Sequence, residues 1–469
     1  MTLLALELND AGLILARIAA GGESEILAES PGFALLEGNT VLTGVTAAAR
    51  ARQRPLFAHS TFWRELGVTP LPRPTATVQT TADVAFTHLS DLLKPLSSGT
   101  ERMVIAVPAG YSRDQLGILI GMANEVGVPL VGLVDAGLAA SSLEAAPRRV
   151  LHLDLELHRA ALTVLEHQGD GEGLRRSHFE LQPRLGWLSL QQAWIEAIAE
   201  TFVRRTRFDP LHQAVTEQAL VDLLPGWLAA LKDAEAVDAE MIFGGQTHRV
   251  ELARKQMIDA VRGKYSDLLR LVQSARPAGE AVELRLGQRL ADLPGAIEQF
   301  AALRDCELKV LPRGAAARGA LLHAPHIERP ADALTLVYRL PVPFAAGAGL
   351  VNAPGETLAV EHRPTHVLFA GRAWPITAEP LKLGWAVPEG QRRLTVPAGA
   401  PGVSRVHCTL VRHDGVTTLE DHSTYGTFVN DERVKGTTVL RVGDRLRLGA
   451  PGVQLELIQL VNEHGTPAV

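Results

Sequence analysis

The pattern of apolar residues and prolines changes near residue 325, and a single kind of fold cannot account for both parts of the chain. Before it, short apolar runs alternate with amphipathic stretches of helical spacing, as in α/β proteins. From Pro325 to about residue 365, prolines interrupt every stretch long enough for a helix, at Pro325, Pro330, Pro341, Pro343, Pro354 and Pro364. Because 469 residues also exceed what one compact core usually holds, the sequence predicts a multidomain protein.

Strands and helices alternate through the first part of the chain. The predicted strands are residues 3–8, 13–18, 103–107, 130–134, 150–155, 160–166, 174–181, 282–286 and 307–310. The predicted helices are residues 113–126, 137–143, 188–205, 216–234, 250–274, 293–303 and 314–323. We interpret Gly244 and Gly245 as a turn between two of these helices. The strand pairs near the start and near residue 150 form hairpins, which is consistent with two duplicated halves.

The C-terminal part contains only short strands separated by turns rich in glycine and proline. The predicted strands are residues 367–369, 381–383, 393–396, 407–412, 417–420, 427–429, 445–448 and 454–460. Strands of this length and spacing are typical of an all-β sandwich.

Composition and charge narrow the class of protein. A net charge of -6 argues against a dedicated nucleic-acid binder, which needs a concentrated basic surface. No apolar run is long enough to span a bilayer, and the apolar start reaches Glu7 without a preceding basic segment, so we expect a first strand rather than a secretion signal. Cys306 and Cys408 are the only cysteines and lack metal-ligand spacing, which favours a reducing cytoplasm and predicts no metal site. Abundant Ala, Arg and Gly with scarce Lys suggests a bacterial source.

Three separated segments of the N-terminal part resemble one known family. Residues 104–115 (Val-Ile-Ala-Val-Pro-Ala-Gly-Tyr-Ser-Arg-Asp-Gln), residues 130–140 and residues 311–320 occur in the order found in DnaK-type heat-shock chaperones. The resemblance implies an actin-like ATPase domain over residues 1–324, which is a duplicated ribonuclease H-like α/β fold. If that domain is active, the resemblance implies ATP with magnesium as cofactor and catalytic roles for Glu7, Asp135 and Asp154.

The turns that hold phosphate in that family are altered here. The family's glycine-rich first turn is replaced by residues 7–11 (Glu-Leu-Asn-Asp-Ala), and its second by residues 154–159 (Asp-Leu-Glu-Leu-His-Arg). Glycines let backbone N–H groups approach phosphate oxygens, whereas Asp10 would place a negative charge against them. The departures indicate a pseudo-ATPase. Asp154 is then a polar residue at a strand end, and His158 and Arg159 form either an exposed basic turn or a new anion site.

The C-terminal part resembles forkhead-associated (FHA) domains. The resemblance rests on residues 404–407 (Ser-Arg-Val-His), on residues 423–430 (Ser-Thr-Tyr-Gly-Thr-Phe-Val-Asn) and on the turn Gly443-Asp444. It implies a β-sandwich over residues 367–469 that binds phosphothreonine through its loops. The density of prolines before it predicts a connector with short strands over residues 325–366.

The resemblance assigns roles to individual residues of that domain. Ser404 and Thr424 lie where the family places hydroxyl donors to phosphate, and Arg405 adds charge. Trp385 replaces the family's phosphate-binding Arg, and Tyr425 replaces the Asn that holds the peptide backbone. The other candidates are Arg392 and Arg393, as substitutes for the lost Arg or as solvated charges, and His407, Gly426 and Asn430, as structural residues.

These substitutions leave several functional hypotheses open. The leading one is a non-catalytic adaptor, scaffold or regulator that acts through protein–protein contacts, with a partner that either contains phosphothreonine or does not. In the second case Trp385 and Tyr425 form an aromatic platform for the unphosphorylated partner. The alternative is an active ATPase of chaperone or filament type that an FHA domain directs to phosphothreonine. A phosphothreonine reader in kinase signalling requires a compensating Arg. The sequence does not indicate the oligomeric state.

Overall fold

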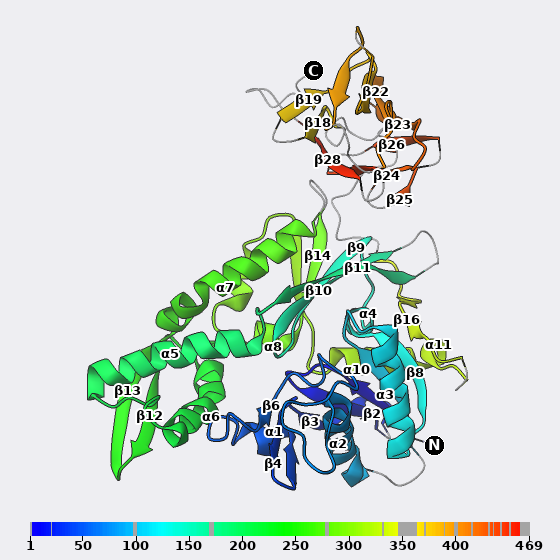
Figure 1. Ribbon diagram of the computed structural model, residues 1–469. Coiled ribbons are helices and arrows are strands. Elements are labelled where there is room, and N and C mark those ends of the chain that lie inside the picture. Colours follow the sequence, from blue (N-terminus) through cyan, green and yellow to red (C-terminus); the bar gives the residue numbers. More distant parts are fainter. Residues whose placement is uncertain are drawn as a thin grey trace. The chain divides into compact units, whose positions relative to one another are not determined.

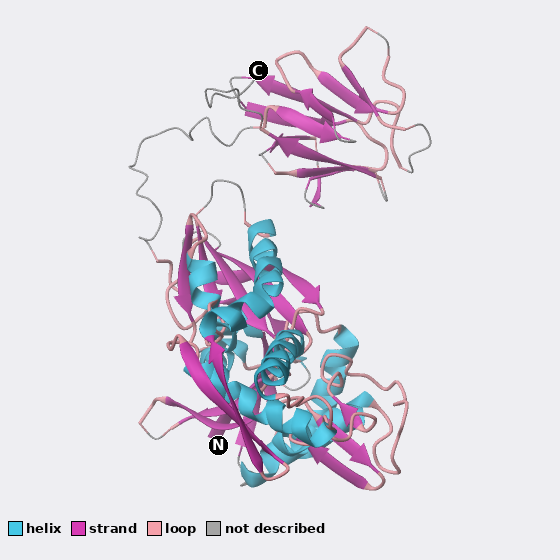
Figure 2. Cartoon of the chain, turned by 90° about the vertical axis from the view of Figure 1, so that its left-hand side faces the viewer, coloured by secondary structure: helices cyan, strands magenta, loops and turns pink. Residues whose placement is uncertain are grey.

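The computed structural model describes residues 2–19, 21–96, 101–167, 173–276, 281–330, 333–345, 364–369, 372–388, 390–397, 402–413, 416–429, 432–434, 436–440, 443–449 and 452–459. The chain divides into two compact units. The first unit consists of Met1–Arg276 and Ala281–Gly349. The second consists of Pro277–Glu280 and Leu350–Val469. The first unit mixes helices and strands, whereas the described part of the second contains strands and loops but no helix (Figures 1 and 2).

The first sheet of the N-terminal unit joins an antiparallel meander to parallel strands. Its strands are β1 (Thr2–Glu7), β2 (Leu13–Ile18), β3 (Ser24–Ser30), β7 (Glu101–Val107), β8 (Leu130–Asp135) and β16 (Leu336–Val337). They are arranged in the order β16-β8-β7-β1-β2-β3. The β1–β2 and β2–β3 pairs are antiparallel, whereas β1–β7 and β7–β8 are parallel.

The second sheet repeats this arrangement with a later part of the chain. Its strands are β9 (Arg149–Leu155), β10 (Arg159–His167), β11 (Leu174–Pro183), β14 (Val282–Leu286), β15 (Cys306–Val310) and β17 (Arg339–Leu340), in the order β15-β14-β9-β10-β11-β17. The β9–β10 and β10–β11 pairs are antiparallel, and β9–β14 and β14–β15 are parallel. Each sheet therefore contains a meander followed by two parallel strands next to the first meander strand.

A single short segment, residues 336–345, adds the last strand to both sheets, and we call it the strap. β16 pairs in parallel with β8, and β17 pairs antiparallel with β11. Tyr338, which lies between them, accepts a hydrogen bond from Arg176 N at 2.9 Å. Leu340 and Val342 are buried, and Phe344 forms a bridge with Ala146. The strap thus connects the two sheets at their outer strands.

Helices surround these sheets, and the ends of some of them follow clear sequence signals. They are α1 (Gly44–Ala48), α2 (Thr81–Leu93), α3 (Arg113–Val126), α4 (Ala136–Ala140), α5 (Trp187–Thr206), α6 (Ala214–Ala230), α7 (Arg254–Ser274), α8 (Gln288–Ala291), α9 (Ala296–Ala301), α10 (Ala315–Leu322) and α11 (Ala324–Ile327). α3, for example, begins with a capping box between Ser112 and Gln115 and ends at Gly127 in the left-handed conformation. Among the residues that the structure describes, no helix is long and apolar enough to cross a membrane.

A β-hairpin lies between α6 and α7, where the sequence predicted only a turn between two helices. β12 (Ala236–Phe243) and β13 (Gln246–Ala253) pair antiparallel across Gly244 and Gly245, and they pack beside α5 and α6 (Figure 1). The interpretation of the two glycines as a turn between helices was therefore wrong. Both have positive φ, 59° and 75°, and a two-residue hairpin turn of this kind needs two such residues.

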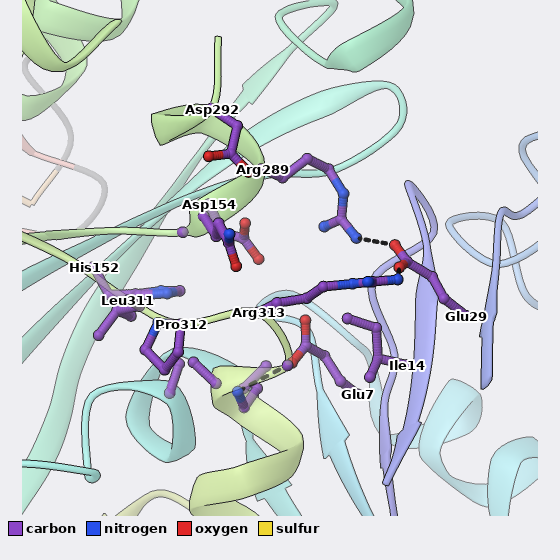
Figure 3. A pocket seen from close by; sticks show the side chains of 17 residues that line it. Glu7, Ile14, Glu29, His152, Asp154, Arg289, Asp292, Leu311, Pro312 and Arg313 are labelled. Carbon is purple, nitrogen blue, oxygen red and sulfur yellow. Dashed lines mark hydrogen bonds and ion pairs between the residues drawn. The ribbon is translucent and has the colours of Figure 1, made fainter. Parts of the chain in front are cut away.

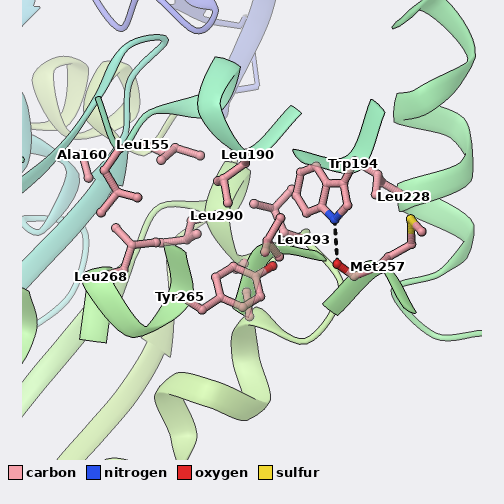
Figure 4. Packing of buried hydrophobic residues seen from close by; sticks show 14 of the residues in the cluster. Leu155, Ala160, Leu190, Trp194, Leu228, Met257, Tyr265, Leu268, Leu290 and Leu293 are labelled. Atoms are coloured by element: carbon pink, nitrogen blue, oxygen red, sulfur yellow. Dashed lines mark hydrogen bonds between the residues drawn. The ribbon is translucent and has the colours of Figure 1, made fainter. Parts of the chain in front are cut away.

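The largest apolar core packs α5 and α7 against the second sheet. Trp194 and Tyr265 are among its largest buried side chains, and each has a polar atom that needs a partner inside the core. Trp194 Nε1 donates to Met257 O at 2.9 Å (Figure 4). Tyr265 Oη donates to Pro294 O at 2.9 Å. These bonds orient both rings, so the core fixes α5 and α7 relative to the strands below.

A buried ion pair, Arg285 with Glu283, lies within the same half of the unit. Arg285, on β14, has a side chain only 1% exposed and donates to the Glu283 carboxylate. It also donates to the backbone oxygens of Ser141 and Ala145, the latter at 2.9 Å. Lys309 Nζ lies 2.7 Å from Glu283 as a second cation. Arg285 therefore links the second sheet to the chain that follows α4.

The second unit is a sandwich of two sheets. One has the order β19-β18-β28-β27-β24-β25 and the other β21-β20-β22-β23-β26. The strands are β18 (His366–Phe369), β19 (Arg372–Pro375), β20 (Leu381–Gly384), β21 (Arg393–Thr395), β22 (Cys408–His413), β23 (Val416–Asp421), β24 (Thr427–Val429), β25 (Glu432–Arg433), β26 (Thr437–Leu440), β27 (Arg445–Leu448) and β28 (Val453–Ile458). Leucines from both sheets, such as Leu383, Leu410 and Leu446, are fully buried between them. This confirms the predicted all-β sandwich, to which the structure adds β19, β25 and β26.

Candidate functional site

Two hairpin turns of the first unit, one from each sheet, meet and bond to each other. Asn9, in the turn between β1 and β2, donates through Nδ2 to Asp154 Oδ2 at 2.8 Å and to Leu155 O at 3.3 Å. The neighbouring Asp10 carboxylate accepts a hydrogen bond from Leu157 N, in the turn between β9 and β10, at 2.6 Å. Side chains of the protein therefore fill the contacts between the two turns.

Glu7, at the end of β1, lies against the start of α10. Its Oε2 accepts hydrogen bonds from Ala316 N at 3.0 Å and Ala317 N at 3.3 Å. Burial raises the pKa of Glu7 to about 7, and the nearby Asp154 charge acts in the same direction. Arg289 and the two backbone bonds oppose this rise but do not cancel it. A carboxyl group of the protein thus occupies a position that would suit an anionic ligand.

Buried carboxyl groups continue around the second turn. Burial raises the pKa of Glu156 to about 8, although Arg159 Nε lies 2.6 Å from its Oε2. Burial also raises the pKa of Asp10. His158 Nε2 contacts Ser60 O at 2.9 Å, so both basic residues of this turn bond to protein groups. This environment disfavours further negative charge between the turns.

Asp135 is held in place by structural contacts. Its Oδ1 accepts a hydrogen bond from Leu138 N at 2.9 Å and thereby caps α4. Its Oδ2 pairs with Arg176 NH1 at 2.6 Å, and the Asp135 side chain is fully buried. The structure therefore brings Glu7 and Asp154 together but engages Asp135 in capping and pairing.

A small pocket lies beside the two turns (Figure 3). Glu7, His152 and Asp154 line it together with Arg289 and Arg313, whose guanidinium groups both pair with Glu29. Its volume of about 180 Å³ is below the roughly 300–1,000 Å³ of common small-molecule sites. Among the described residues, no group of three His, Cys, Asp or Glu side chains could hold a metal ion.

A second set of contacts joins the chain after α1 to α5 and α6. Arg52 NH1 lies 2.9 Å from Glu217 Oε1, and its NH2 lies 3.3 Å from Gln192 Oε1. Gln218 accepts from Arg52 N at 2.9 Å and donates to Ala48 O at 3.1 Å. The two halves of the unit are thus connected at a distance from the turns as well as between them.

Glu7→Gln is expected to remove a pH dependence of stability. The folded-state pKa of Glu7 is about 7 and its ordinary value is 4.5, so the folded protein keeps a proton that the unfolded chain releases between these values. Stability from this group is therefore fully present below about pH 4.5 and is lost as the pH rises through about 7. Gln resembles the protonated acid, so at about pH 8 the variant should be more stable than the wild type by about 2–3 kcal/mol.

Urea unfolding of the full chain between about pH 5 and 8 measures this difference. The exposed Glu25 carboxylate, on the same sheet, provides the control, because Glu25→Gln should leave the wild-type pH dependence in place. An equal pH dependence in Glu7→Gln and the wild type would contradict the assignment.

In the second unit, the end of β20 contacts the loop of residues 404–407. Trp385 N donates to Ser404 O at 3.4 Å and Ala386 N donates to Arg405 O at 3.1 Å. Gly384 permits this approach, because a Cβ there would lie 2.8 Å from Arg405 C and 3.0 Å from Ser404 O. The contact places position 385 beside the loop that carries Ser404.

His407 holds this loop from within the sandwich. It is fully buried, its Nδ1 accepts from Ser404 N at 3.0 Å and its Nε2 lies 3.2 Å from Gly426 O. Ser404 Oγ in turn accepts a hydrogen bond from Thr424 N at 3.2 Å. The two loops that carry the sequence motifs are therefore bonded side by side.

The exposed surface of these loops carries charge, hydroxyl and aromatic groups. The Arg405 Cζ atom lies 5.8 Å from the centroid of the half-buried Trp385 ring. Tyr425 is 65% exposed, and Thr424 is exposed beside it. The Arg433 side chain covers Gly426, where an added Cβ would lie 2.7 Å from its Nε. Arg433 lies outside the loop motifs, so the sequence gives no signal for its place beside Gly426.

The other two candidate arginines have different surroundings. Arg392 donates to Glu379 O at 2.9 Å and to Pro375 O at 2.6 Å, which fixes its guanidinium on the chain between β19 and β20. Arg393 NH1 lies 3.5 Å from Val387 O. Asn430 lies outside the described residues. The structure therefore brings Trp385, Ser404, Arg405, Thr424 and Tyr425 together, and separates Arg392 from them by its bonds.

Comparison with known proteins identifies the second unit. Residues 390–449 match the family model of the FHA domain, and this stretch includes both bonded loops. The C-terminal β-sandwich is therefore an FHA domain, a type of module that mediates protein–protein interaction through phosphothreonine. No curated protein matches the chain.

Proposed function

We propose that this chain is a non-catalytic adaptor, in which an actin-like domain without a working nucleotide site supports an FHA domain that binds a partner protein. The observation that carries the proposal is the direct bonding of the two hairpin turns through Asn9 and Asp10. In an actin-like ATPase the phosphates of the nucleotide lie between these turns.

The repeated sheet supports the actin-like assignment. Both sheets have a meander followed by two parallel strands, as expected for two ribonuclease H-like halves. The three segments that resemble DnaK-type chaperones fall at equivalent junctions: residues 104–115 lead from β7 into α3, residues 130–140 from β8 into α4, and residues 311–320 into α10.

The chemistry between the turns argues against nucleotide binding. Asp10 accepts the hydrogen bond from Leu157 N that a phosphate oxygen would need. Glu7 likewise uses the N–H groups at the start of α10. A nucleotide would have to displace these carboxyl groups and then overcome their repulsion, in a pocket of only about 180 Å³.

The side-chain contacts that hold the first unit together favour a structural role for it. Arg52 bonds to α5 and α6, and Glu29 pairs with both Arg289 and Arg313. These pairs close the unit through its own side chains. A domain held in this way provides a constant surface, which suits a scaffold better than a nucleotide-driven cycle.

The proposal predicts that the full chain does not respond to Mg-ATP. Thermal unfolding and isothermal titration calorimetry with millimolar Mg-ATP should reveal no stabilisation and no saturable heat, whereas a ligand at 100 times its Kd would add about 2.7 kcal/mol. Micromolar binding with phosphate release that Asp154→Ala abolishes would instead support the active ATPase. In that case Glu7 and Asp154, which line the pocket, would be the catalytic candidates.

A further inference from the structure

The hairpin of β12 and β13 forms a sheet of only two strands (Figure 1). Its inner face, which includes Met241 and Val250, is buried in the core, with β13 packed against α5 and β12 against α6. The side chains of the other face are exposed. In the part of the chain that the structure describes, no further strand pairs with either edge of the hairpin. Both edges are therefore open.

Three residues of β13 direct their backbone N–H and C=O groups to its open edge. The pair Phe243–Gln246 closes the turn, and from there hydrogen-bonded pairs alternate with non-hydrogen-bonded pairs along the antiparallel ladder. Thr247, Arg249 and Glu251 therefore point these groups away from β12. Among the described residues, none of the three N–H groups donates a backbone hydrogen bond. Such a row of unpaired groups can accept another strand.

The exposed side chains of the hairpin include one unfavourable pair. Asp238 and Glu251 lie directly opposite each other in the ladder, and within the described ranges neither forms an ion pair. Like charges in this position destabilise a strand pair. The next pair on the same face, Glu240 with Arg249, is an ion pair. The hairpin thus lacks a cation beside Glu251.

A second copy of β13 supplies that cation in one register. When two copies of β13 pair antiparallel and are centred on Val250, Arg249 of each copy lies opposite Glu251 of the other. Centring on Arg249 would instead place two arginines together, and centring on Glu251 two glutamates. β12 is less suited to pairing with itself, because a register centred on any of residues 238–240 places carboxylates opposite each other.

We propose that the open edge of β13 is a homodimerisation surface, on which β13 of a second copy pairs antiparallel about Val250 to form a four-stranded sheet. The arrangement has two-fold symmetry, so both contacts between Arg249 and Glu251 form together. Each Arg249 then lies between Glu240 of its own hairpin and Glu251 of the second copy. This inference goes beyond the proposed function, because a dimeric adaptor presents two FHA domains and gains avidity for a partner with two binding sites.

Sedimentation velocity of the full chain at about 1–300 µM measures the association, which should be weak because one pair of strands is a small interface. Arg249→Glu and Glu251→Arg should each raise the dissociation constant of the dimer at least about 100-fold, because like charges then face each other twice. An equimolar mixture of the two variants should dimerise again, since each arginine of one variant faces a glutamate of the other. Recovery in the mixture excludes loss of folding as the cause of the single effects.

Arg17→Glu is the matched control. Arg17 also forms an exposed ion pair with the residue directly opposite it on the neighbouring strand, Glu25, but β2 is an interior strand of the first sheet. This substitution should leave the association unchanged.

Three results would overturn the proposal. The first is a wild type that stays monomeric over the whole concentration range, and the second is a dimer that both single variants retain. The third is an assembly larger than a dimer, because it requires β13 to pair with a different edge of the next copy, such as β12, without two-fold closure.

Discussion

Gly384→Ala is expected to lower the free energy of unfolding of the FHA domain by about 3–5 kcal/mol and to abolish partner binding. An added Cβ would lie 2.8 Å from Arg405 C and 3.0 Å from Ser404 O, and these backbone atoms cannot rotate away as a side chain can. The end of β20 would have to separate from the loop. The hydrogen bonds from Trp385 N and Ala386 N would then be lost, together with the Trp385–Arg405 contact.

Differential scanning calorimetry of the full chain, combined with peptide titration, measures both effects of this substitution. Gly390→Ala is the control, because Gly390 has a φ of 85° and no atom within 4 Å of an added Cβ. Only left-handed backbone strain of about 1–2 kcal/mol should result there. If Gly384→Ala were no more destabilising than Gly390→Ala, the close approach of β20 to the loop would be wrong.

Arg285→Ala should destabilise the first unit by about 3–5 kcal/mol. The Arg285 side chain is 1% exposed, and its removal leaves the Glu283 carboxylate, itself 2% exposed, with Lys309 as its remaining cation. The backbone oxygens of Ser141 and Ala145 also lose their donor. A buried acceptor without a partner retains its desolvation cost, which is why removing one member of such a cluster has a large effect.

A surface pair in the same unit provides the comparison for Arg285. Arg270 is 75% exposed and pairs with Asp267 one turn away on α7, so Arg270→Ala should change stability by less than about 0.5 kcal/mol. Urea unfolding followed by the fluorescence of buried tryptophans reports on this unit. A loss below about 1 kcal/mol in Arg285→Ala would contradict the buried-cluster assignment.

The sequence predicted those helices and strands in which the spacing of apolar residues matches the face that is buried in the structure. β7 and α3 follow from a buried apolar run and a capped amphipathic helix, and every strand predicted for the sandwich lies on an observed strand. The hairpin β12–β13 was missed because Gly244 and Gly245 were interpreted as a turn between helices and residues 250–253 were assigned to the following helix. Two consecutive glycines between alternating apolar residues were the available signal for a hairpin.

The candidate site was only partly predictable, for a physical reason. Sequence motifs indicated that Glu7 and Asp154 matter, and the structure brings both to one pocket. No motif predicts that Asn9 and Asp10 bond to Asp154, Leu155 and Leu157, because these residues lie far along the chain. Such contacts depend on how the two sheets pack. Likewise, the position of Arg405 over Trp385 depends on backbone pairing between β20 and a distant loop.

The strap has a consequence for where the first unit can be cut. β8 and β11 are the strands that β16 and β17 cover, so a fragment without the strap would present two open strand edges. Such edges offer unpaired backbone groups to any other extended chain and promote aggregation. Loss of the strap would also expose the apolar contacts of Leu340 and Val342. A proteolytic cut before the strap would therefore release an association-prone fragment rather than a self-contained domain.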